Sequence, residues 1–577
     1  MAVREDLLEQ TAAAEVGART TVQLLSLLRS RGVQLWAEGE KLLYSAPPGA
    51  LPTELLAELK ERKDDLLGFL RQGFVARRSG APSRIEAAHR ERPPLSFAQQ
   101  RLWFLHQLMP ESVEYNIARA VRLRGRVRVE LLAASLGEIV RRHGSLRTTF
   151  AVEEGQPVQV VAPVLELALP LVDLAALPAG RREAEAWRLS QEDARRPFHL
   201  ARGPLLRVFL LRLEAEDYIA PSTMHHVIGD GWSSSILFRE MGIVYGALRR
   251  AEPPVLPELP VQYADFAVWQ RQWLSGEVLE EQLGYWKQHL AGAPPELALP
   301  IDRPRSSVHE AGAERGDRRE LLIPRPLVES LREFSQAQGA TLFMILLAAW
   351  KVLLCRLCGQ DDLVVGSPIA NRNRTEVEGL IGCFVNTLVL RTIFSGNPSF
   401  RKLLASVRHT TLGAFAHQDL PFEKLVEELH PERRLTQTPL FQVIFTLQNV
   451  PSPEMDVADF RMSLLPPTGQ AATFDLACNL KEMQEGVHTS LMYKEGLFDG
   501  ATIARLGGCY LRLLAALADD PGLKVRDLPL LSACEGQQLL REWNDMAGCP
   551  RPESGLYELI AAQAACTPEA VAVVAGE

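Results

Sequence analysis

Residues 224–233 read MHHVIGDGWS, and this stretch is the sharpest local signal in the sequence. It follows two strand-like runs at residues 205–213 and 218–224, and it precedes a helical pattern at residues 231–248. Pro221 inside the second run predicts that this strand is interrupted or lies near the edge of a sheet. Two adjacent histidines at such a junction point in different directions, so one can face solvent or a tunnel while the other is held in the structure.

His226, His225, Asp230 and Gly231 are the candidate functional residues of this stretch. The pKa of a free histidine lies near ~6.5, so its side chain can take or give a proton near neutral pH. Asp230 could orient the ring of His226 or pair with an arginine. Gly231 would let other backbone approach closely, and the helix N-terminus behind it favours developing negative charge. The competing interpretation, two structural histidines beside a turn, is disfavoured by an Asp and a Gly at this spacing.

Sequence signals for other kinds of site are weak. There is no HExxH, and Cys355 and Cys358 form a single CxxC in an apolar helical pattern at residues 341–357, which favours core packing over a metal site. No GxxxxGK[ST] or GxGxxG predicts nucleotide binding, and no GxSxG predicts a serine-based acyl-enzyme. We therefore expect no metal ion and no cofactor bound by this chain.

Length and composition narrow the class of protein. The 577 residues suffice for several domains of roughly 100–200 residues each. With 47% apolar and 23% charged residues the chain is typical of globular protein, and its net charge of −8 argues against nucleic-acid binding. No uncharged apolar run approaches ~20 residues, so no membrane span is expected. The N-terminus lacks the apolar core of a secretory signal, and the 8 cysteines, none before Cys355, indicate a reduced, cytoplasmic setting.

The first part of the chain, residues 1–72, is predicted to be a miniature domain. Its pattern indicates a helix at residues 22–31, a hairpin at 33–44 and one or two helices at 51–72. A helical extension of the following domain is the alternative. Residues 73–94 lack periodicity and are rich in Arg, Ala, Ser and Pro, so they are predicted to be a linker.

The main body, residues 95–530, mixes strand and helix patterns and is predicted to have an α/β (α+β) fold. It is too long for one simple core, which predicts two lobes at about residues 95–265 and 266–530. Residues 531–577 contain a helix and the beginning of a strand, which predicts a linker and a truncated domain. Strands of the second lobe are expected at residues 363–366, 387–394, 441–447 and 474–480.

The segment around His226 resembles the HHxxxDG core motif of condensation domains of non-ribosomal peptide synthetases. Six other stretches resemble further motifs of that family, in the family's order, so the resemblance is highly specific. Gly144 stands where the second motif usually has Glu, Cys383 fills a variable slot of the fifth, and the beginning of the seventh is degenerate. The stretches are residues 96–105 (SFAQQRLWFL), 142–150 (RHGSLRTTF), 263–269 (YADFAVW), 381–387 (IGCFVNT), 417–423 (HQDLPFE) and 438–443 (TPLFQV).

This resemblance implies two chloramphenicol-acetyltransferase-like lobes in a V-shaped pseudo-dimer with a tunnel between them. It implies that the amine of a downstream carrier-bound aminoacyl thioester attacks an upstream acyl or peptidyl thioester, both on phosphopantetheine arms. His226 would be the catalytic histidine, acting as base or by positioning the amine, and His225 its structural companion. Asp230 would pair with an arginine, for which we expect Arg142. Arg147, Trp269 and Asn386 carry over as supporting positions.

The flanks resemble parts of the same assembly systems. Residues 21–71 resemble an N-terminal docking domain of the TubC type, which captures the C-terminal tail of the preceding subunit. Residues 556–574 (LYELIAAQAACTPEAVAVV) resemble the opening of an adenylation domain. The resemblance thus implies three partners: an upstream carrier protein with its docking tail, a downstream adenylation domain and a downstream carrier domain. Nucleic acid and membrane are not expected as partners.

Two alternatives share parts of this pattern. An epimerisation domain also carries HHxxxDG, although such domains follow a carrier domain and this unit follows a docking domain. The intact HHxxxDG argues against a catalytically silent scaffold for carrier proteins, whereas the degenerate second and seventh motifs leave room for one. A heterocyclase would carry DxxxxD in place of HHxxxDG, which this chain does not.

Overall fold

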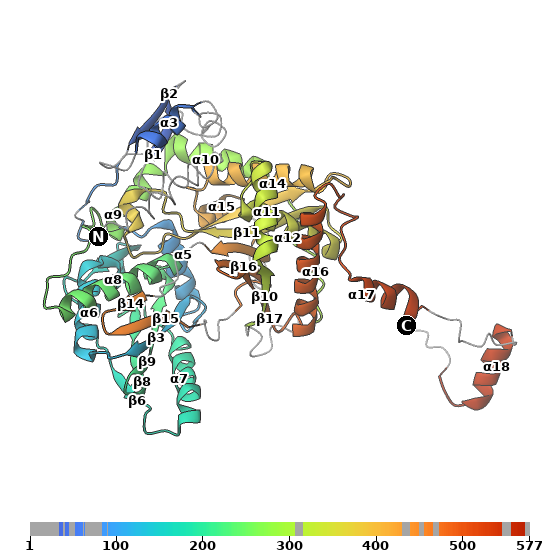
Figure 1. The fold of residues 1–577 in the computed structure, drawn as a ribbon, viewed down its shortest axis with the longest axis horizontal. Helices are drawn as coiled ribbons and strands as arrows, with labels where there is room; N and C mark the ends of the chain where they lie inside the picture. The colour runs from blue at the N-terminus through green and yellow to red at the C-terminus, as the bar shows by residue number, and fades with distance from the viewer. Residues whose placement is uncertain are drawn as a thin grey trace, which may run out of the picture. The chain divides into compact units, whose positions relative to one another are not determined.

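Two large mixed sheets dominate residues 1–528, the first of two units in the computed structural model (Figure 1). The structure describes residues 34–38, 41–45, 52–61, 63, 84–88, 90–305, 316–429, 439–448, 455–465, 472–544 and 555–571. The two sheets and the helices around them confirm the predicted mixed α/β architecture. Each sheet is described below with its helices, followed by the small N-terminal hairpin and the second unit.

The first sheet has seven strands in the order β14-β15-β3-β9-β8-β6, with β7 also paired to β9. Its strands are β3 (Asn116–Gly125), β6 (Leu171–Asp173), β7 (Leu206–Val208), β8 (Leu210–Glu214), β9 (Asp217–His225), β14 (Met455–Val457) and β15 (Phe460–Leu464). The surrounding elements are α5 (Phe97–Leu108), α6 (Val129–Arg142), η1 (Gly144–Arg147), the hairpin of β4 (Thr148–Glu153) and β5 (Gln156–Val161), α7 (Ala179–Ala194), η2 (His226–Ile228) and α8 (Gly231–Arg249).

The second sheet has six strands in the order β10-β17-β16-β13-β11-β12. They are β10 (Gly316–Pro324), β11 (Asp362–Ile369), β12 (Asn386–Ile393), β13 (Val443–Gln448), β16 (Leu476–Met483) and β17 (Gly486–Lys494). The helices between residues 263 and 519 are α9 (Tyr263–Trp273), α10 (Gly276–Leu290), α11 (Arg325–Ala337), α12 (Leu342–Cys358), α13 (Thr375–Glu378), α14 (Phe400–Ala416), α15 (Phe422–Leu429) and α16 (Gly500–Asp519).

The two sheets are not formed by two consecutive halves of the chain. β14 and β15 come after most of the second sheet in sequence, yet β15 pairs antiparallel with β3, with Met462 opposite Leu123. Val457, Phe460 and Met462 join the apolar core of the first sheet. This strand pair therefore ties a late part of the chain to the sheet that carries His225.

Pro221 lies in the interior of the first sheet, so the prediction of an interrupted or edge strand was wrong. β9 runs without a break and is flanked by β3 on one side and by β7 and β8 on the other. The interruption lies in the neighbouring strand, at Phe209 between β7 and β8, where the Phe209 N–H donates to the Pro221 carbonyl. Pro221 has no N–H to return a bond to the Phe209 carbonyl, so one ladder bond is missing at this point and the neighbouring strand is divided there.

α12 is the central helix beside the second sheet, as its nearly continuous apolar sequence predicts. Thr341 caps its N-terminus by accepting from the Met344 N–H, and Gly359 ends it in the left-handed conformation at φ 64°. Cys355, in the CxxC, is buried in this helix, as expected from core packing. Lys351 is the exception to the apolar pattern and is also fully buried.

By length and composition one described helix, α16, could cross a membrane, and α11 with α12 could if that bent pair is one span. The apolar face of α16 is instead covered by protein: Ile503, Leu513 and Leu517 are fully buried. Tyr510 packs edge-on to Trp350 of α12 and donates its hydroxyl to the Leu346 carbonyl at 3.0 Å. These contacts are those of a core helix.

The N-terminal region contains a two-stranded antiparallel sheet of β1 (Gln34–Glu38) and β2 (Lys41–Ser45), followed by α3 (Thr53–Glu61). The predicted hairpin and the first part of the predicted helix at 51–72 are thus present. Leu55 and Leu59 of α3 are buried. The predicted helix at 22–31 and the end of the 51–72 helix lie outside the described residues.

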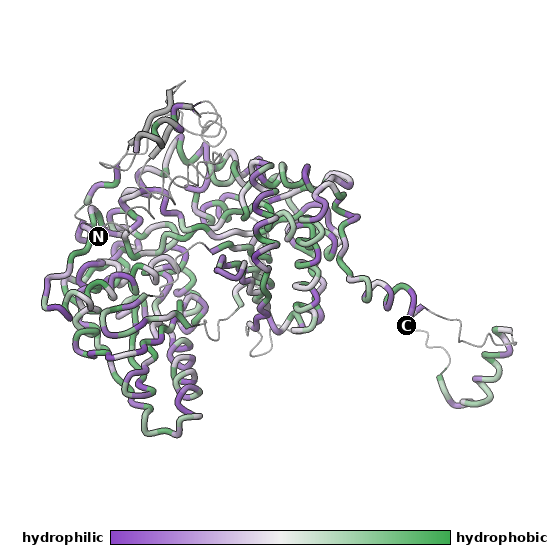
Figure 2. Tube along the Cα trace, in the orientation of Figure 1, coloured by the Kyte–Doolittle hydropathy of each residue, from purple (hydrophilic) through white to green (hydrophobic). Residues whose placement is uncertain are grey.

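The second unit, residues 529–577, contains α17 (Ala533–Gln537), a π-helical turn at Gln538–Glu542 and α18 (Leu556–Cys566). The helix expected in the tail is present. Figure 2 shows mainly hydrophobic residues along α18, and none of them is buried. The strand expected after it falls largely outside the described residues.

Candidate active site

His225 is the last residue of β9 and is held inside the first sheet. Its ring is 4% exposed and lies edge-on to His106 and Phe198. Its Nδ1 accepts a hydrogen bond from the Val227 N–H at 3.1 Å. Burial lowers the pKa of His225 to about 3, with further lowering by His226 and His106. His225 is therefore a neutral, buried side chain whose Nδ1 holds the backbone of the turn.

His226 begins the short helical turn η2 and is partly exposed. Its backbone N–H donates to the Tyr115 carbonyl at 2.8 Å, which fixes the residue against the start of β3. The Nδ1 atom lies 3.6 Å from the Cys383 sulfur. Burial lowers the pKa of the imidazole and Asp230 opposes that effect, so the ring is neutral at neutral pH. A neutral imidazole can accept a proton or hold a hydrogen bond.

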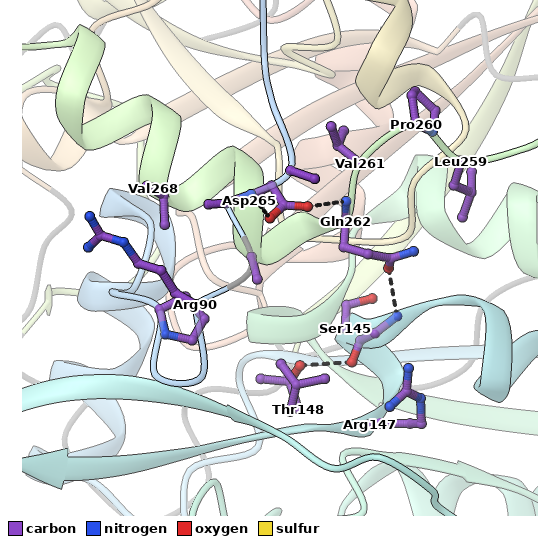
Figure 3. Close-up of a pocket in the computed structure, with 16 residues that line it drawn as sticks. Arg90, Ser145, Arg147, Thr148, Leu259, Pro260, Val261, Gln262, Asp265 and Val268 are labelled. Atoms are coloured by element: carbon purple, nitrogen blue, oxygen red, sulfur yellow. Dashed lines mark hydrogen bonds between the residues drawn. The ribbon is translucent and has the colours of Figure 1, made fainter.

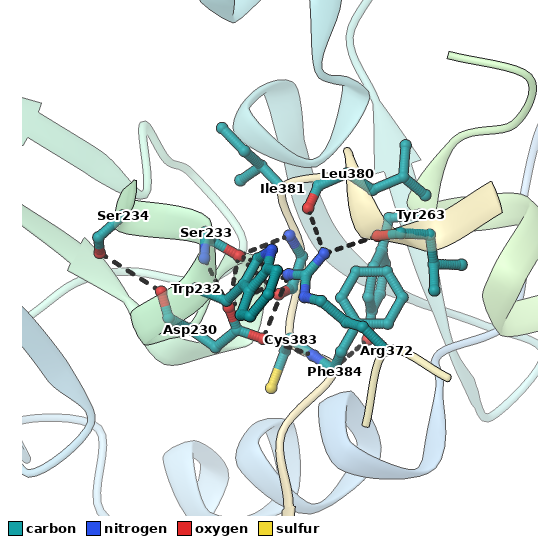
Figure 4. A network of polar contacts seen from close by, with 12 residues as sticks. Asp230, Trp232, Ser233, Ser234, Tyr263, Arg372, Leu380, Ile381, Cys383 and Phe384 are labelled. Atoms are coloured by element: carbon teal, nitrogen blue, oxygen red, sulfur yellow. Dashed lines mark hydrogen bonds and ion pairs between the residues drawn. The ribbon is translucent and has the colours of Figure 1, made fainter. Parts of the chain in front are cut away.

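Asp230 is the N-cap of α8 and the centre of a buried polar network (Figure 4). Its Oδ1 accepts from the Ser233 N–H at 2.8 Å, and its Oδ2 accepts from the Phe384 N–H at 3.1 Å. Arg372 donates Nη2 to Oδ1 at 3.2 Å, and both side chains are almost fully buried. The carboxylate thus joins the start of α8 to two segments flanking β12 and β11, and it contacts no atom of the His226 ring among these bonds.

The arginine paired with Asp230 is Arg372, so the expectation of Arg142 was wrong. Arg142 is the last residue of α6, and α6 packs beside α8, where its Nε reaches Glu240 at 3.2 Å. Glu240 lies ten residues beyond Asp230 along α8, so the guanidinium of Arg142 cannot pair with both carboxylates. Arg372 follows β11 within ANRNR, and its Nη1 also donates to the carbonyls of Val377 and Leu380. No sequence motif pointed to it.

The other carried-over residues have supporting contacts. Arg147 donates to backbone carbonyls, among them Val140 at 3.0 Å and Pro163 at 3.2 Å. Asn386 begins β12, donates Nδ2 to the Leu420 carbonyl at 2.8 Å and accepts from the Phe422 N–H at 2.9 Å. Trp269 stacks on Trp273 with 5.1 Å between ring centroids. Arg147 and Asn386 thus hold neighbouring backbone segments together, whereas the Trp269 stacking lies within α9.

Gly231 is the first residue of α8 and is exposed, and a Cβ added to it would meet no atom within 4 Å among the described residues. The expected close approach of other backbone to Gly231 is therefore not seen there. Gly382 has the opposite environment, because its added Cβ would lie 1.9 Å from the ring of Tyr263. The position that demands glycine is the one beside Cys383.

A cavity of about 340 Å³ lies between η1 and the start of α9 (Figure 3). Gly144 contributes to its wall, and Gln262 spans it by accepting from the Gly144 N–H at 2.9 Å. Asp265 ties the linker to the same place by accepting from the Ala88 N–H at 2.7 Å. His226 does not line this cavity, so it is separate from the histidine site.

The sequence profile of the family described as Condensation domain matches residues 89–540 of the chain. The chain belongs to the condensation domain family. The profile described as TubC N-terminal docking domain matches residues 22–72, as the N-terminal sequence predicts.

Relatives of this condensation domain occur within large synthetases. One of the linear gramicidin synthase proteins of Brevibacillus parabrevis is 49% identical over 488 residues, covering 84% of this chain and 9% of that protein. Chondramide synthase cmdD of Chondromyces crocatus is 42% identical over 504 residues, covering 87% of this chain and 13% of that protein. The chain therefore spans only a small fraction of the length of these relatives.

Solved structures confirm the fold. The X-domain in complex with OxyB from teicoplanin biosynthesis is 29% identical with a TM-score of 0.70, covering 79% of this chain and 100% of that chain. The first condensation domain of the CDA synthetase is 22% identical with a TM-score of 0.62, covering 76% and 99%, and this likeness concerns the fold alone.

Four other sequence motifs of the condensation domain are linked by contacts near the histidine site. Ser96 of the first motif lies 2.8 Å from the Tyr263 hydroxyl of the fourth, which donates to the Cys383 carbonyl of the fifth at 2.7 Å. Arg101 of the first motif donates to Glu423 of the sixth at 3.2 Å. Segments separated by hundreds of residues thus converge beside His226.

Proposed function

We propose that this chain catalyses amide-bond formation between two carrier-bound substrates. The amine of the downstream aminoacyl thioester attacks the upstream acyl or peptidyl thioester carbon. A C–N bond forms, the C–S bond breaks, and the amine proton replaces the acyl group on the released phosphopantetheine thiol. The observation that carries this proposal is His226: a partly exposed imidazole on the residue that follows β9, with its Nδ1 atom 3.6 Å from the Cys383 sulfur.

The reaction makes two demands that the site can meet. The pKa of an α-amino group lies near ~8, so a large share of it is protonated at neutral pH and must lose a proton to attack. A neutral His226 can take that proton or hold the free amine in line with the thioester. The second demand is stabilisation of the oxyanion that develops as the amine attacks. Helix α8 begins at Gly231, and its N-terminus supplies positive dipole potential for that charge.

His226→Ala tests the proposal in an assay with donor-loaded and acceptor-loaded carrier proteins, with the amide product measured by mass spectrometry. Loss of general-base or positioning catalysis costs on the order of 10²–10⁴ in rate. His488→Ala, on β17 of the second sheet, is the matched control and is expected to retain turnover. Near wild-type turnover by His226→Ala with both carriers loaded would refute the proposed site.

A scaffold that gathers other proteins is the second candidate. The X-domain, 29% identical to this chain, is solved in a complex with OxyB, so a domain of this fold can bind a separate protein. The assay above separates the candidates. Binding of loaded carriers without product supports the scaffold, and inverted stereochemistry without a new bond supports an epimerisation domain.

The partners follow from the same assignment. Residues 22–72 would capture the C-terminal tail of an upstream synthetase subunit, and residues 531–577 would begin an adenylation domain that precedes a downstream carrier domain. Residues 73–94 would link the docking region to the condensation domain at 95–530. The substrates would arrive on phosphopantetheine arms in the cytoplasm, and the chain itself would hold no cofactor.

A further inference from the structure

We propose that Cys383 is a positioning residue for His226. The Cys383 sulfur accepts the Nδ1–H of the His226 imidazole and thereby leaves the lone pair of Nε2 for the substrate amine. This inference rests on the proposed role of His226. It chooses between the two neutral forms of the ring, and it favours a base over a hydrogen-bond donor at Nε2.

The contact between the two side chains is close and sheltered. The Cys383 sulfur lies 3.6 Å from Nδ1 of His226, within hydrogen-bonding range for sulfur. Cys383 is only 3% exposed, whereas His226 is partly exposed. The sulfur therefore covers the inner edge of the ring, and the accessible part of the imidazole lies elsewhere.

The backbone around Cys383 is fixed on both sides, so the sulfur cannot easily move away from the ring. The Gly382 N–H donates to the Ser233 hydroxyl at 3.1 Å, and the Phe384 N–H donates to Asp230 at 3.1 Å (Figure 4). Between them, the Cys383 carbonyl accepts from the Tyr263 hydroxyl. The Asp230 network thus acts on His226 through Cys383, without touching the ring.

The surroundings of Nδ1 favour a proton on that ring nitrogen. The backbone of His226 acts on its own ring in the direction that raises the pKa of the imidazole, and Nδ1 is the ring nitrogen nearest that backbone. A carbonyl oxygen only accepts, so it selects the form that carries hydrogen at Nδ1. Sulfur is a weak acceptor, so the Cys383 sulfur can share the hydrogen on Nδ1 without removing it from the ring.

A cysteine beside a histidine could instead be a nucleophile, as in enzymes that form a thioester intermediate. Burial raises the pKa of the Cys383 thiol well above its usual range, and Asp230 and Glu423 raise it further. Such a thiol stays protonated, and the thiolate is the nucleophilic form. Cys383 is therefore assigned to positioning and not to acyl transfer.

The charges that act on the His226 ring come from three directions. Asp230 favours the protonated imidazole, whereas Arg101 on α5 and Arg119 on β3 disfavour it. The neighbouring ring of His225 is neutral near pH 7 and the Cys383 thiol is protonated. Replacing Cys383 by alanine leaves the ionic groups in place and opens space for water beside the ring, where desolvation is the largest influence on the pKa.

The test compares Cys383→Ala, Cys383→Ser and Cys478→Ala in the full chain with both carriers loaded. Cys383→Ala is expected to lower kcat about 10-fold with little change in KM, within the ~10²-fold that misplacing a catalytic group can cost. In the pH profile of kcat/KM for Cys383→Ala, the acidic limb is expected to move to higher pH. Cys383→Ser restores an acceptor and recovers part of kcat. Cys478, a buried thiol on β16, controls for loss of a buried cysteine.

Nitrogen-15 NMR of histidine-labelled wild-type protein provides a second readout that needs no variant to fold. It is expected to show His226 with hydrogen at Nδ1, and hydrogen at Nε2 would overturn the inference. Wild-type kcat and pH profile in Cys383→Ala would also overturn it, as would an acyl group on Cys383 in intact-mass spectra. Activity in His226→Ala would instead refute the proposed function, so the two failures are distinguishable.

Discussion

Asp230 and Arg372 form a buried ion pair, with 3.2 Å between the carboxylate Oδ1 and the guanidinium Nη2. It joins the N-terminus of α8, in the part of the chain that forms the first sheet, to the segment that follows β11 of the second. The same carboxylate also accepts the Phe384 N–H, next to Cys383. One residue of the HHxxxDG motif therefore links the sheets and sets the wall of the histidine site.

Asp230→Ala is expected to lower stability as well as turnover. The change removes the N-cap of α8 and leaves Arg372 buried without its carboxylate, and breaking a buried pair in this way costs roughly 3–5 kcal/mol. Thermal unfolding of the purified variant measures the effect. Asp173→Ala, which breaks an exposed ion pair with Arg212, is the control and should leave the melting temperature unchanged. Unchanged melting of Asp230→Ala with lost activity would assign Asp230 a chemical role.

His225→Ala is expected to destabilise the turn and to change the response to acid. The Val227 N–H loses its acceptor, and a buried unsatisfied group costs about 1–3 kcal/mol. Because the pKa of His225 is about 3 in the fold and 6.5 ordinarily, the unfolded chain binds the extra proton. Wild-type stability therefore falls as pH drops from 6.5 toward 3. Denaturant unfolding across this window should show a shallower fall in His225→Ala, and an unchanged slope would contradict the assignment.

Arg119→Gln is expected to move the acidic limb of kcat/KM to higher pH. The positive charge of Arg119 lowers the pKa of His226, so its removal lets the imidazole hold a proton at higher pH. A base must be unprotonated, and activity is then lost earlier on acidification. Arg124→Gln is the matched control, since Arg124 lies exposed on the same strand. A limb that moves to lower pH would mean that His226 is not the group titrating.

Several features of the fold could be predicted from sequence because they depend on local pattern. The nearly continuous apolar run at 341–357 predicted a buried helix, and α12 agrees with it to within a residue at each end. The strand-to-helix junction at His226 was predicted for the same reason. Pro221 misled, because its tolerance depends on a gap at Phe209 in the neighbouring strand, and strand neighbours are a tertiary property.

The site was predictable where a motif carried it and not where partners came from distant segments. His225, His226 and Asp230 stand within six residues of one another, so the motif named them. Arg372 lies 142 residues away from Asp230, and the chain contains many arginines that could fill the role. Cys383 occupied a variable slot of its motif, and only its 3.6 Å distance to His226 gives it significance.

Deleting residues 1–72 is expected to weaken capture of the upstream carrier without slowing the chemical step. Among the described residues β1 and β2 pair only with each other, so each leaves an edge where a partner tail can add as a strand. Tethering acts through effective concentration, so the half-saturating carrier concentration should rise while turnover at saturation is unchanged. Turnover lost even at saturating carrier would mean that these residues belong to the catalytic fold.

Lys351 should make the stability of the second sheet depend on pH. Burial lowers its pKa to about 7 from 10.5, although Nζ donates to the Leu390 carbonyl at 2.9 Å and to the Thr392 hydroxyl at 2.7 Å. Between these values the unfolded chain holds a proton that the folded chain has lost. Stability therefore rises with pH across this window, by at most about 1.4 kcal/mol per pH unit.

Lys351→Met removes that titration, so denaturant unfolding at several pH values should give a smaller rise between pH 7 and 10 than in the wild type. The difference between the slopes is the readout, because the absolute stability also includes the lost bonds to Leu390 and Thr392. Lys402→Met, at an exposed position of α14, is the matched control and should keep the wild-type slope. Equal slopes in all three proteins would mean that Lys351 keeps its charge inside the fold, with the Leu390 carbonyl and the Thr392 hydroxyl sufficient to hold an ammonium group.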